Sequence, residues 1–363
     1  MEIEAKAANP HVQPHGLSKK TIQRLKYLAI ALTSGGVAVF VYFIYAVGIH
    51  EIIEGVGKIG LAGFGAVIFI YFMRIVMRAW AWQLSVYEPY TLTLRDTIPA
   101  VIIGESLSAV IPLGILISGT TKAVAVRRRL PLVVGLSSVA TENLFYSLVT
   151  SIFLILGALT FIRSFHLDDA WIATIDVIIG VMGVLIVLGV LMVIRQWHFA
   201  SEICEWLYQK GIGRRFLENG RLEVRLFENL IYGFYRRYPK RFIPICLLET
   251  GFHLLGILEG WFILSRISEA SPEFLTAFLL ESVSRLITIV FKLVPFLIGV
   301  DEAGAQFVTE TLALGAGVGI AIAIIRKGRI LFWTAIGVLL IIKRGLSLRD
   351  LTHARHESET LAD

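Results

Sequence analysis

Acidic and basic side chains interrupt the longest apolar runs of this chain, and they are the groups best able to do chemistry there. If the runs cross a bilayer, a charge near its centre costs at least ~2.5–3.5 kcal/mol on insertion scales. Such groups must therefore face a polar interior, pair with one another, or be neutral. Taken together they predict a polar cavity inside the membrane. They are Glu105, Glu142, Glu249, His253, Glu259, Glu281, Arg285, Lys292, Asp301, Glu302 and Arg326.

Two neighbouring pairs in this set have simpler local explanations. Glu281 and Arg285 are four residues apart, which places them on one helical face as a local ion pair. Two acidic residues, at 301 and 302, follow a segment rich in glycine and proline, where the N-terminus of a helix favours negative charge. Glu142 and Arg326 have no local partner of this kind, so they are the harder members to explain without a cavity.

Metal and catalytic motifs offer no competing chemistry. Glu249 and His253 have the i,i+4 spacing of two metal ligands, but no third ligand accompanies them, and a buried hydrogen bond is the simpler interpretation. Cys204 and Cys246 form neither a disulfide framework nor a metal-binding pattern. No phosphate-binding Gly-rich loop, nucleophile elbow or His-Glu-x-x-His motif occurs. We therefore expect no metal, no cofactor and no enzymatic activity, because an intramembrane enzyme would need a nucleophile or a metal site.

The elements that carry these charges are expected to be membrane helices. Of the 363 residues, 56% are hydrophobic and only 17% are charged, whereas ordinary soluble domains carry about 25% charged residues. Several apolar runs reach the ~20 residues needed to cross a hydrocarbon core, and about seven or eight spans fit the chain. The clearest runs are residues 28–48, 172–194 and 242–264. The expected fold class is all-α, a polytopic helical bundle with Gly/Pro-broken re-entrant segments.

Basic residues between the runs indicate the orientation. The net charge is +6 and falls mainly in the connections, which the positive-inside rule explains without a nucleic-acid partner. Arg24 and Lys26 precede the first span, which predicts a cytoplasmic N-terminus. Residues 195–241 hold ten Lys/Arg against five Glu, as a cytoplasmic loop would. Apolar side chains recur in this loop at helical spacing, at Leu222, Leu226, Leu230 and Phe234. They indicate either a helix lying on the inner leaflet or a solvated linker.

Two apolar segments are interrupted by proline and glycine. Residues 97–121 have basic residues at both ends, which predicts a re-entrant hairpin of two half-helices broken at Pro112. The second segment is broken at Pro295. Each precedes a long helix that carries a charge, Glu142 in one case and Arg326 in the other. Paired broken segments at matching positions are typical of a transporter-type site between two internal repeats.

The expected organisation is one membrane domain with polar tails. Its parts are residues 1–26, a cytoplasmic tail; residues 27–343, the membrane domain, with halves at 27–194 and 242–343 joined by the basic loop; and residues 344–363, a polar C-terminal tail. One detail stays open. Residues 305–342 form either two spans with a basic turn or one long helix from about 316 to 343 with Arg326 in mid-membrane.

Four segments together have a familiar pattern. They are Ser108-Ala109-Val110-Ile111-Pro112 with Gly119 and Lys122; Arg78-Ala79-Trp80-Ala81-Trp82; Glu142-Asn143-Leu144-Phe145; and Val294-Pro295 through Gly299-Val300-Asp301-Glu302-Ala303 with Arg326 downstream. This pattern resembles the flippase-like family, which includes the membrane half of lysylphosphatidylglycerol synthase. The spacing from Pro112 to Lys122 is most similar to the hopanoid-biosynthesis-associated branch. The chain departs from the family where Lys122 and Asn143 replace arginines.

The resemblance implies a protein of the bacterial cytoplasmic membrane that binds or moves a polar lipid. Its partners would be membrane lipids with an anionic or zwitterionic headgroup. Cationic side chains would hold a phosphate or carboxylate, and acidic side chains would neutralise those cations in the empty site. The residues expected to form this site are Glu105, Pro112, Gly119, Lys122, Glu142, Asn143, Glu259, Glu281, Arg285, Pro295, Gly299, Glu302 and Arg326.

An alternative function belongs to a different class. The chain could be a non-transporting scaffold or regulator of a lipid- or glycan-synthesis enzyme, with the loop 195–241 as its working surface and that enzyme as its partner. Glycines 57, 60 and 63 form a helix-contact face that fits internal packing and a homodimer equally well.

Overall fold

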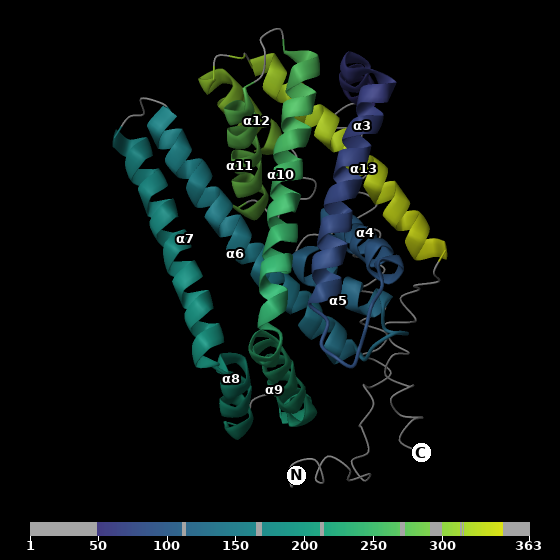
Figure 1. The fold of residues 1–363 in the computed structure, drawn as a ribbon, viewed down its shortest axis with the longest axis vertical. Helices are drawn as coiled ribbons and strands as arrows, with labels where there is room; N and C mark the ends of the chain where they lie inside the picture. The colour runs from purple at the N-terminus through teal and green to yellow at the C-terminus, as the bar shows by residue number, and fades with distance from the viewer. Residues whose placement is uncertain are drawn as a thin grey trace.

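The protein is built from helices. The computed structural model describes residues 49–110, 114–164, 169–210, 214–268, 273–290, 300–312, 314 and 316–343. Every regular element in these ranges is helical, which confirms the all-α fold class (Figure 1). In chain order they are α3 (Ile49–Leu84), α4 (Leu94–Val110), α5 (Gly114–Ala125), α6 (Leu132–Ser164), α7 (Asp169–Arg195), α8 (Phe199–Gln209), α9 (Arg214–Arg237), the 3-10 helix η1 (Pro239–Arg241), α10 (Phe242–Ile267), α11 (Phe274–Val290), α12 (Val300–Thr311) and α13 (Ala316–Lys343).

Three segments are long and apolar enough to cross a membrane. They are Gly57–Leu84 in α3, Leu132–Arg163 in α6, and Pro239–Ile267, which comprises η1 and α10. α7 adds a shorter apolar stretch, Ile179–Gly189. Large apolar side chains on these helices point outward, as expected where acyl chains replace water. The structure thus supports a membrane protein, while the total number of spans and the internal repeat stay predictions.

The last long apolar segment is one helix rather than two spans. α13 runs without a break from Ala316 to Lys343. Arg326 lies near its middle and is 5% exposed. Its two basic neighbours, Lys327 and Arg329, are buried as well. A basic turn at a membrane surface would leave these cations exposed, so their burial requires carboxylates on the helices around α13.

Two short helices occupy the segment that was expected to be a broken hairpin. α4 ends at Val110, α5 begins at Gly114, and the two pack against each other. Pro112, the expected break, lies outside the described residues. At the start of α4, the backbone N–H and hydroxyl of Thr93 donate to the Asp96 carboxylate, at 3.1 and 2.7 Å. These bonds resemble one half of a capping box and fix where the helix begins.

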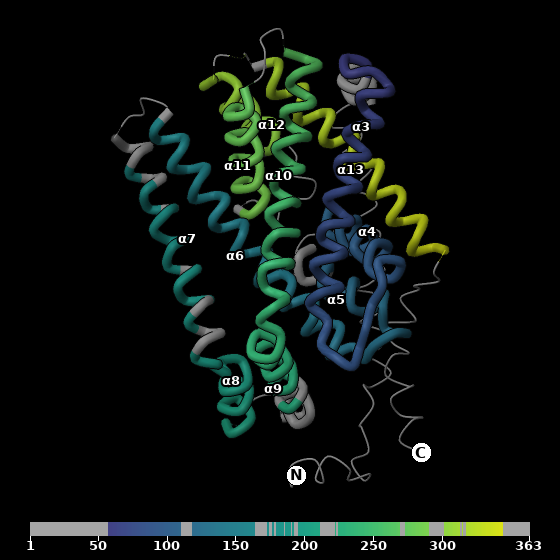
Figure 2. The backbone as a smooth tube through the Cα atoms, in the orientation of Figure 1, coloured from purple at the N-terminus to yellow at the C-terminus, as the bar shows by residue number. Residues whose placement is uncertain are grey.

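α10 stands at the centre of the bundle. It packs most extensively on α3 and also contacts α6, α11 and α13 (Figures 1 and 2). α13 crosses the bundle obliquely and packs on α4 and α12. Two large apolar clusters fill these contacts, one around Leu279 and Ile322 and the other around Ile75 and Trp82. The core therefore fixes the faces of α3, α10 and α13 that carry charged residues.

The basic loop contains a helical hairpin at one end of the molecule, α8 followed by α9 (Figure 1). The Glu228 carboxylate of α9 accepts backbone hydrogen bonds from Ala200 and Ser201 at the start of α8, at 2.9 and 3.3 Å. This satisfies N–H groups that a helix leaves free at its N-terminus. Most of the described part of the basic loop is therefore helical, and its position on the inner leaflet stays a prediction.

Candidate functional site

One face of α3 organises the polar interior. Tyr71, Arg74 and Arg78 follow one another at spacings of three and four residues, so they lie on the same side of the helix. Arg74 is only 2% exposed. Its guanidinium lies 4.3 Å from the centroid of the Phe252 ring of α10. A buried guanidinium needs carboxylate partners, and α10 and α11 supply them.

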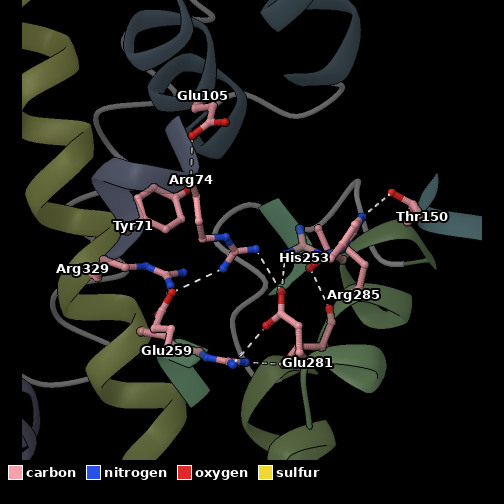
Figure 3. Close-up of polar contacts among 12 residues, drawn as sticks. Tyr71, Arg74, Glu105, Thr150, His253, Glu259, Glu281, Arg285 and Arg329 are labelled. Carbon is pink, nitrogen blue, oxygen red and sulfur yellow. Dashed lines mark hydrogen bonds and ion pairs between the residues drawn. The ribbon is translucent and has the colours of Figure 1, made fainter. Parts of the chain in front are cut away.

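Four arginines and two glutamates form the arginine network: Arg74, Glu259, Glu281, Arg285, Arg326 and Arg329 (Figure 3). Glu281 accepts bonds from Arg74 at 2.9 Å and Arg285 at 2.6 Å. Its other oxygen accepts a bond from Arg326 at 3.2 Å. Glu259 accepts a hydrogen bond from Arg74 at 3.3 Å and another from Arg329. The network thereby ties together α3, α10, α11 and α13.

A glycine on α10 makes room for this network. A Cβ atom at Gly256 would lie 2.4 Å from Oε1 of Glu281 and 3.1 Å from Cζ of Arg74. Contacts this short do not occur between real side chains, so no larger residue fits while the ion pair keeps its place. The absence of a side chain at this position therefore lets charged groups from α3 and α11 meet beside α10.

A second charged cluster lies one turn further along α3. Arg78 donates two hydrogen bonds to Oε1 of Glu142 in α6, at 3.1 and 2.9 Å. It also donates to the side chain of Asn143 at 3.3 Å and lies 3.7 Å from Glu105 of α4. Tyr71 donates to the same Glu105 at 3.1 Å. Lys122 and Glu249 interact electrostatically with Arg78, and we call Arg78, Glu105, Lys122, Glu142 and Glu249 the Arg78 cluster.

A cavity of about 410 Å³ lies between the arginine network and the Arg78 cluster. Residues of α3, α4, α5, α6, α11 and α13 line it. Its charged lining residues are Arg78, Glu105, Lys122 and Arg285. Its hydroxyl groups belong to Tyr71, Ser106, Ser108, Ser118, Tyr146, Ser147, Thr288 and Thr334. The bundle therefore contains a cavity with several hydrogen-bonding groups on its wall, and its role as the predicted polar site stays a prediction.

The cavity wall carries more positive than negative charge. Arg285 and Arg78 are each paired with a carboxylate, Glu281 and Glu142 respectively. Among the described residues no ion pair is formed by Lys122, which lies on the wall and is 3% exposed. An ammonium group in such a place favours an anionic ligand, because a buried charge is costly until it is neutralised.

Most of the predicted site residues meet at these two places. Glu105, Gly119, Lys122, Asn143 and Arg285 line the cavity. The carboxylates at 142, 259 and 281 and the Arg326 guanidinium pair behind it. Glu302 is separate, because its carboxylate pairs with Lys327 between α12 and α13. Pro112, Pro295 and Gly299 lie outside the described residues, so their predicted roles are untested.

The sequence interpretation missed the arginines of α3 as part of the site. An Arg- and Trp-rich end of an apolar run is typical of snorkelling side chains at a membrane surface. Instead, Arg74 is buried and Arg78 lines the cavity. The available signal was the spacing of these residues with Tyr71, which aligns three polar side chains on one face of an apolar helix. Arg329 was missed because its partner Glu259 is 70 residues away in the chain.

Metal-binding chemistry finds no support in the described part of the chain, where no group of three or more His, Cys, Asp or Glu side chains is placed to hold an ion. His253 instead forms a 3.0 Å hydrogen bond with Thr150 and stacks on Phe153 at 4.6 Å. The hydrogen-bond interpretation of this histidine is therefore the one that its surroundings favour.

Comparison with known proteins identifies the family of the chain. No curated protein and no solved structure matches the chain. A family model described as the lysylphosphatidylglycerol synthase TM region matches residues 27–337. The match supports the resemblance to the flippase-like family, though not to its hopanoid-associated branch. With its apolar helices, the chain is thus a membrane protein linked to lipid metabolism or transport. It belongs to the family of lysylphosphatidylglycerol synthase transmembrane regions.

Proposed function

We propose that the protein binds a polar lipid by an anionic headgroup in the cavity and carries that lipid across the bacterial cytoplasmic membrane. The observation that supports this most directly is the position of Arg78, Lys122 and Arg285 on the wall of one cavity inside a helical membrane protein. Arg78 and Arg285 already have carboxylate partners. Lys122 forms no ion pair among the described residues, and a cation in such a place is costly unless an anion offsets it.

The size of the cavity suits a headgroup rather than a whole lipid. Small-molecule sites usually measure about 300–1,000 Å³, and this cavity measures about 410 Å³. A lipid phosphodiester has two charged non-bridging oxygens, which can accept hydrogen bonds from the guanidinium, ammonium and hydroxyl donors of the wall. Acyl chains would stay in the bilayer, where they lose no hydrophobic contact.

When a headgroup binds, Arg78 can exchange its contact with Glu105 for a contact with the phosphate, so the charge around Arg78 changes little. Glu105 lies 3.7 Å from Arg78, too far for a good hydrogen bond but close enough to offset part of its charge. An incoming phosphate would replace this weak contact with direct hydrogen bonds. Glu105 would then be free to meet the amine of a zwitterionic headgroup, which is why both headgroup classes fit.

Lys122 gives the sharpest test of the proposal. We expect Lys122→Gln to slow the transbilayer movement of fluorescent phosphatidylglycerol in proteoliposomes by about ten- to a hundredfold, because a hydrogen bond to a charged group contributes about 1.5–3 kcal/mol. Lys122→Arg retains the cation and should keep most of the rate. The measurement is the loss of fluorescence when a membrane-impermeant reductant destroys the outer-leaflet dye.

Lys343→Gln is the matched control, because Lys343 is exposed at the end of α13 and remote from the cavity wall. Its rate should equal that of the wild type. Movement of labelled phosphatidylglycerol, phosphatidylethanolamine and phosphatidylcholine no faster than in protein-free vesicles would contradict transport. Binding without movement would instead favour the scaffold or regulator alternative.

A further inference from the structure

Two buried carboxyl groups face each other beside the cavity. Glu249 of α10 and Glu142 of α6 are both 0% exposed. The two side chains lie within hydrogen-bonding reach of each other. Neither oxygen of Glu249 receives a hydrogen bond from any described residue, and neither does Oε2 of Glu142. The bonds from Arg78 go to the other oxygen of Glu142, Oε1. Among the described residues Glu249 therefore has no hydrogen-bond donor, and a second carboxyl group lies within its reach.

The close contact between Glu142 and Glu249 is favourable only if one of the two carboxyl groups is protonated. Two charged carboxylates that share a buried site repel each other, whereas a pair that shares one proton can form a hydrogen bond. A protonated Glu249 can donate its O–H to the free oxygen of Glu142, while Glu142 keeps its charge for Arg78. One proton thus satisfies the oxygens that otherwise lack a donor.

We propose that Glu142 and Glu249 share a single exchangeable proton, and that its binding is coupled to the occupancy of the cavity by an anionic headgroup. The inference deepens the proposed function and rests on it. The proton arrives from water and binds a carboxylate oxygen, so no other reactant is needed. Protonation of this pair would make the protein a proton-linked lipid carrier.

The coupling follows from the charges that surround Glu249. Arg78 from α3, Glu142 from α6 and Lys122 from α5 face it, and Cys246 lies on its own helix. Both of these cations also line the cavity. Glu105 adds a third carboxylate on this side of the wall, 3.7 Å from Arg78. Without the shared proton, three carboxylates outnumber the two cations and repel an anion. With the proton, the charges balance, and an anion binds more tightly.

Linkage makes the effect reciprocal. A headgroup that binds better to the protonated protein must raise the proton affinity of the pair by the same factor. Above the pH at which the pair loses its proton, the apparent affinity for an anion should fall by up to about tenfold per pH unit for one linked proton. Below that pH the affinity should be constant.

Infrared spectroscopy of the purified protein tests the proton without any lipid substrate. We expect a carbonyl stretch of a protonated carboxylic acid at neutral pH, shielded from water, that disappears in Glu249→Gln. Glu273→Gln is the control, because Glu273 is exposed next to α11, and it should leave the band unchanged. A wild-type spectrum without the band, or a band that persists in Glu249→Gln, overturns the shared proton whatever the lipid experiments show.

The second measurement tests the coupling with dihexanoylphosphatidylglycerol, a water-soluble lipid whose phosphodiester stays singly charged over the pH range used. Calorimetry should show proton uptake on binding to the wild type and an affinity that falls as the pH rises. Glu249→Gln should bind with the wild type's low-pH affinity at every pH and take up no proton, whereas Glu249→Asp should restore the pH dependence. A pH-independent wild-type affinity overturns the coupling but leaves the proposed function standing. No binding of any lipid at any pH, with the infrared band present, removes the proposed function and the coupling together.

Discussion

Glu281 is the residue on which most of the buried charge depends. Its two oxygens accept hydrogen bonds from arginines of three helices, α3, α11 and α13. It is 2% exposed, so water does not screen these interactions. Four guanidinium groups and two carboxylates make up the arginine network, and the loss of either carboxylate leaves like charges close together without compensation.

Glu281→Gln should therefore destabilise the protein strongly. Removal of one partner from a buried ion pair costs about 3–5 kcal/mol, mostly because the remaining charge stays buried and unpaired. Thermal unfolding in detergent micelles would report the change as a large fall in the transition temperature. Glu310→Gln is the matched control, since Glu310 is exposed on α12 and, among the described residues, accepts a hydrogen bond from Gln306 alone, at 2.8 Å. Equal transition temperatures for the two variants would contradict a structural role for Glu281.

Charge type was predictable from the sequence at this scale, but pairing was not. Glutamates and an arginine inside apolar runs had to meet in a polar interior because the membrane allows little else. Glu281 and Arg285 do form the expected i,i+4 pair. The spacing of residues along one helix predicts this pair and no other partner of Glu281. The same carboxylate also binds Arg74 and Arg326, which are far away in the chain, and only the helix crossings decide that.

Helix crossings in this bundle depend on close backbone approach at a few glycines. α12 and α13 pack against each other, and Gly319 of α13 lies in that contact. A Cβ atom there would be 2.6 Å from the carbonyl oxygen of Ala305 and 2.5 Å from Oγ1 of Thr309. The Ala305 oxygen belongs to the backbone, so it cannot move aside without shifting α12. The register of Lys327 with Glu302 depends on the same crossing.

Gly319→Ala should destabilise the protein by about 1–3 kcal/mol through overpacking between α12 and α13. Gly317→Ala offers a control in the same helix, because a Cβ atom at Gly317 would meet nothing within 4 Å. That second substitution should leave stability unchanged or raise it by up to about 1 kcal/mol, since alanine favours helix more than glycine does. The free energies of unfolding of the two variants in the same detergent would separate the effect of overpacking from that of helix propensity. Equal changes in the two variants would argue against a close crossing of α12 and α13.

Helix positions were largely predictable, whereas the way in which helices cross was not. Apolar length indicated α7 and α10 to within a few residues, from the runs 172–194 and 242–264. The arrangement of residues 305–342 stayed open, because a run of basic residues fits a cytoplasmic turn as well as a helix with buried ion pairs. The structure shows the long helix. The deciding factor is the set of carboxylates on other helices, which a local pattern does not contain.

The molecule as a whole has an apolar bundle and a basic hairpin at one end (Figure 1). The hairpin of α8 and α9 is attached to the bundle by Phe234, whose ring is buried near Phe145 and Ile245. The other end of the predicted apolar stripe is exposed, with Leu222 63% and Leu226 50% accessible. The apolar stripe therefore packs against the bundle at its Phe234 end, and its Leu222 end is exposed and available to the membrane surface.

α8 adds a second apolar surface beside this stripe. Phe199, Ile203 and Trp206 are all substantially exposed on it. A basic helical hairpin with apolar side chains on one side is the pattern of an interfacial segment that lies in the headgroup region of an anionic leaflet. Arg225 and Arg236 of α9 are exposed and available to anionic lipid headgroups. We expect the hairpin to lie on the leaflet rather than in bulk water.

Trp206 can report this position directly, because its ring is 52% exposed and lies 4.2 Å from the Lys210 ammonium group. In lipid nanodiscs, acyl chains brominated near the headgroup should quench part of the tryptophan fluorescence, and Trp206→Phe should remove that part. Chains brominated near their ends should have a weaker effect on the same component, because the hairpin lies shallowly. Quenching of Trp206 by an aqueous quencher but by neither brominated lipid would place the hairpin in water. That result would favour a surface available to a soluble partner, as the scaffold alternative requires.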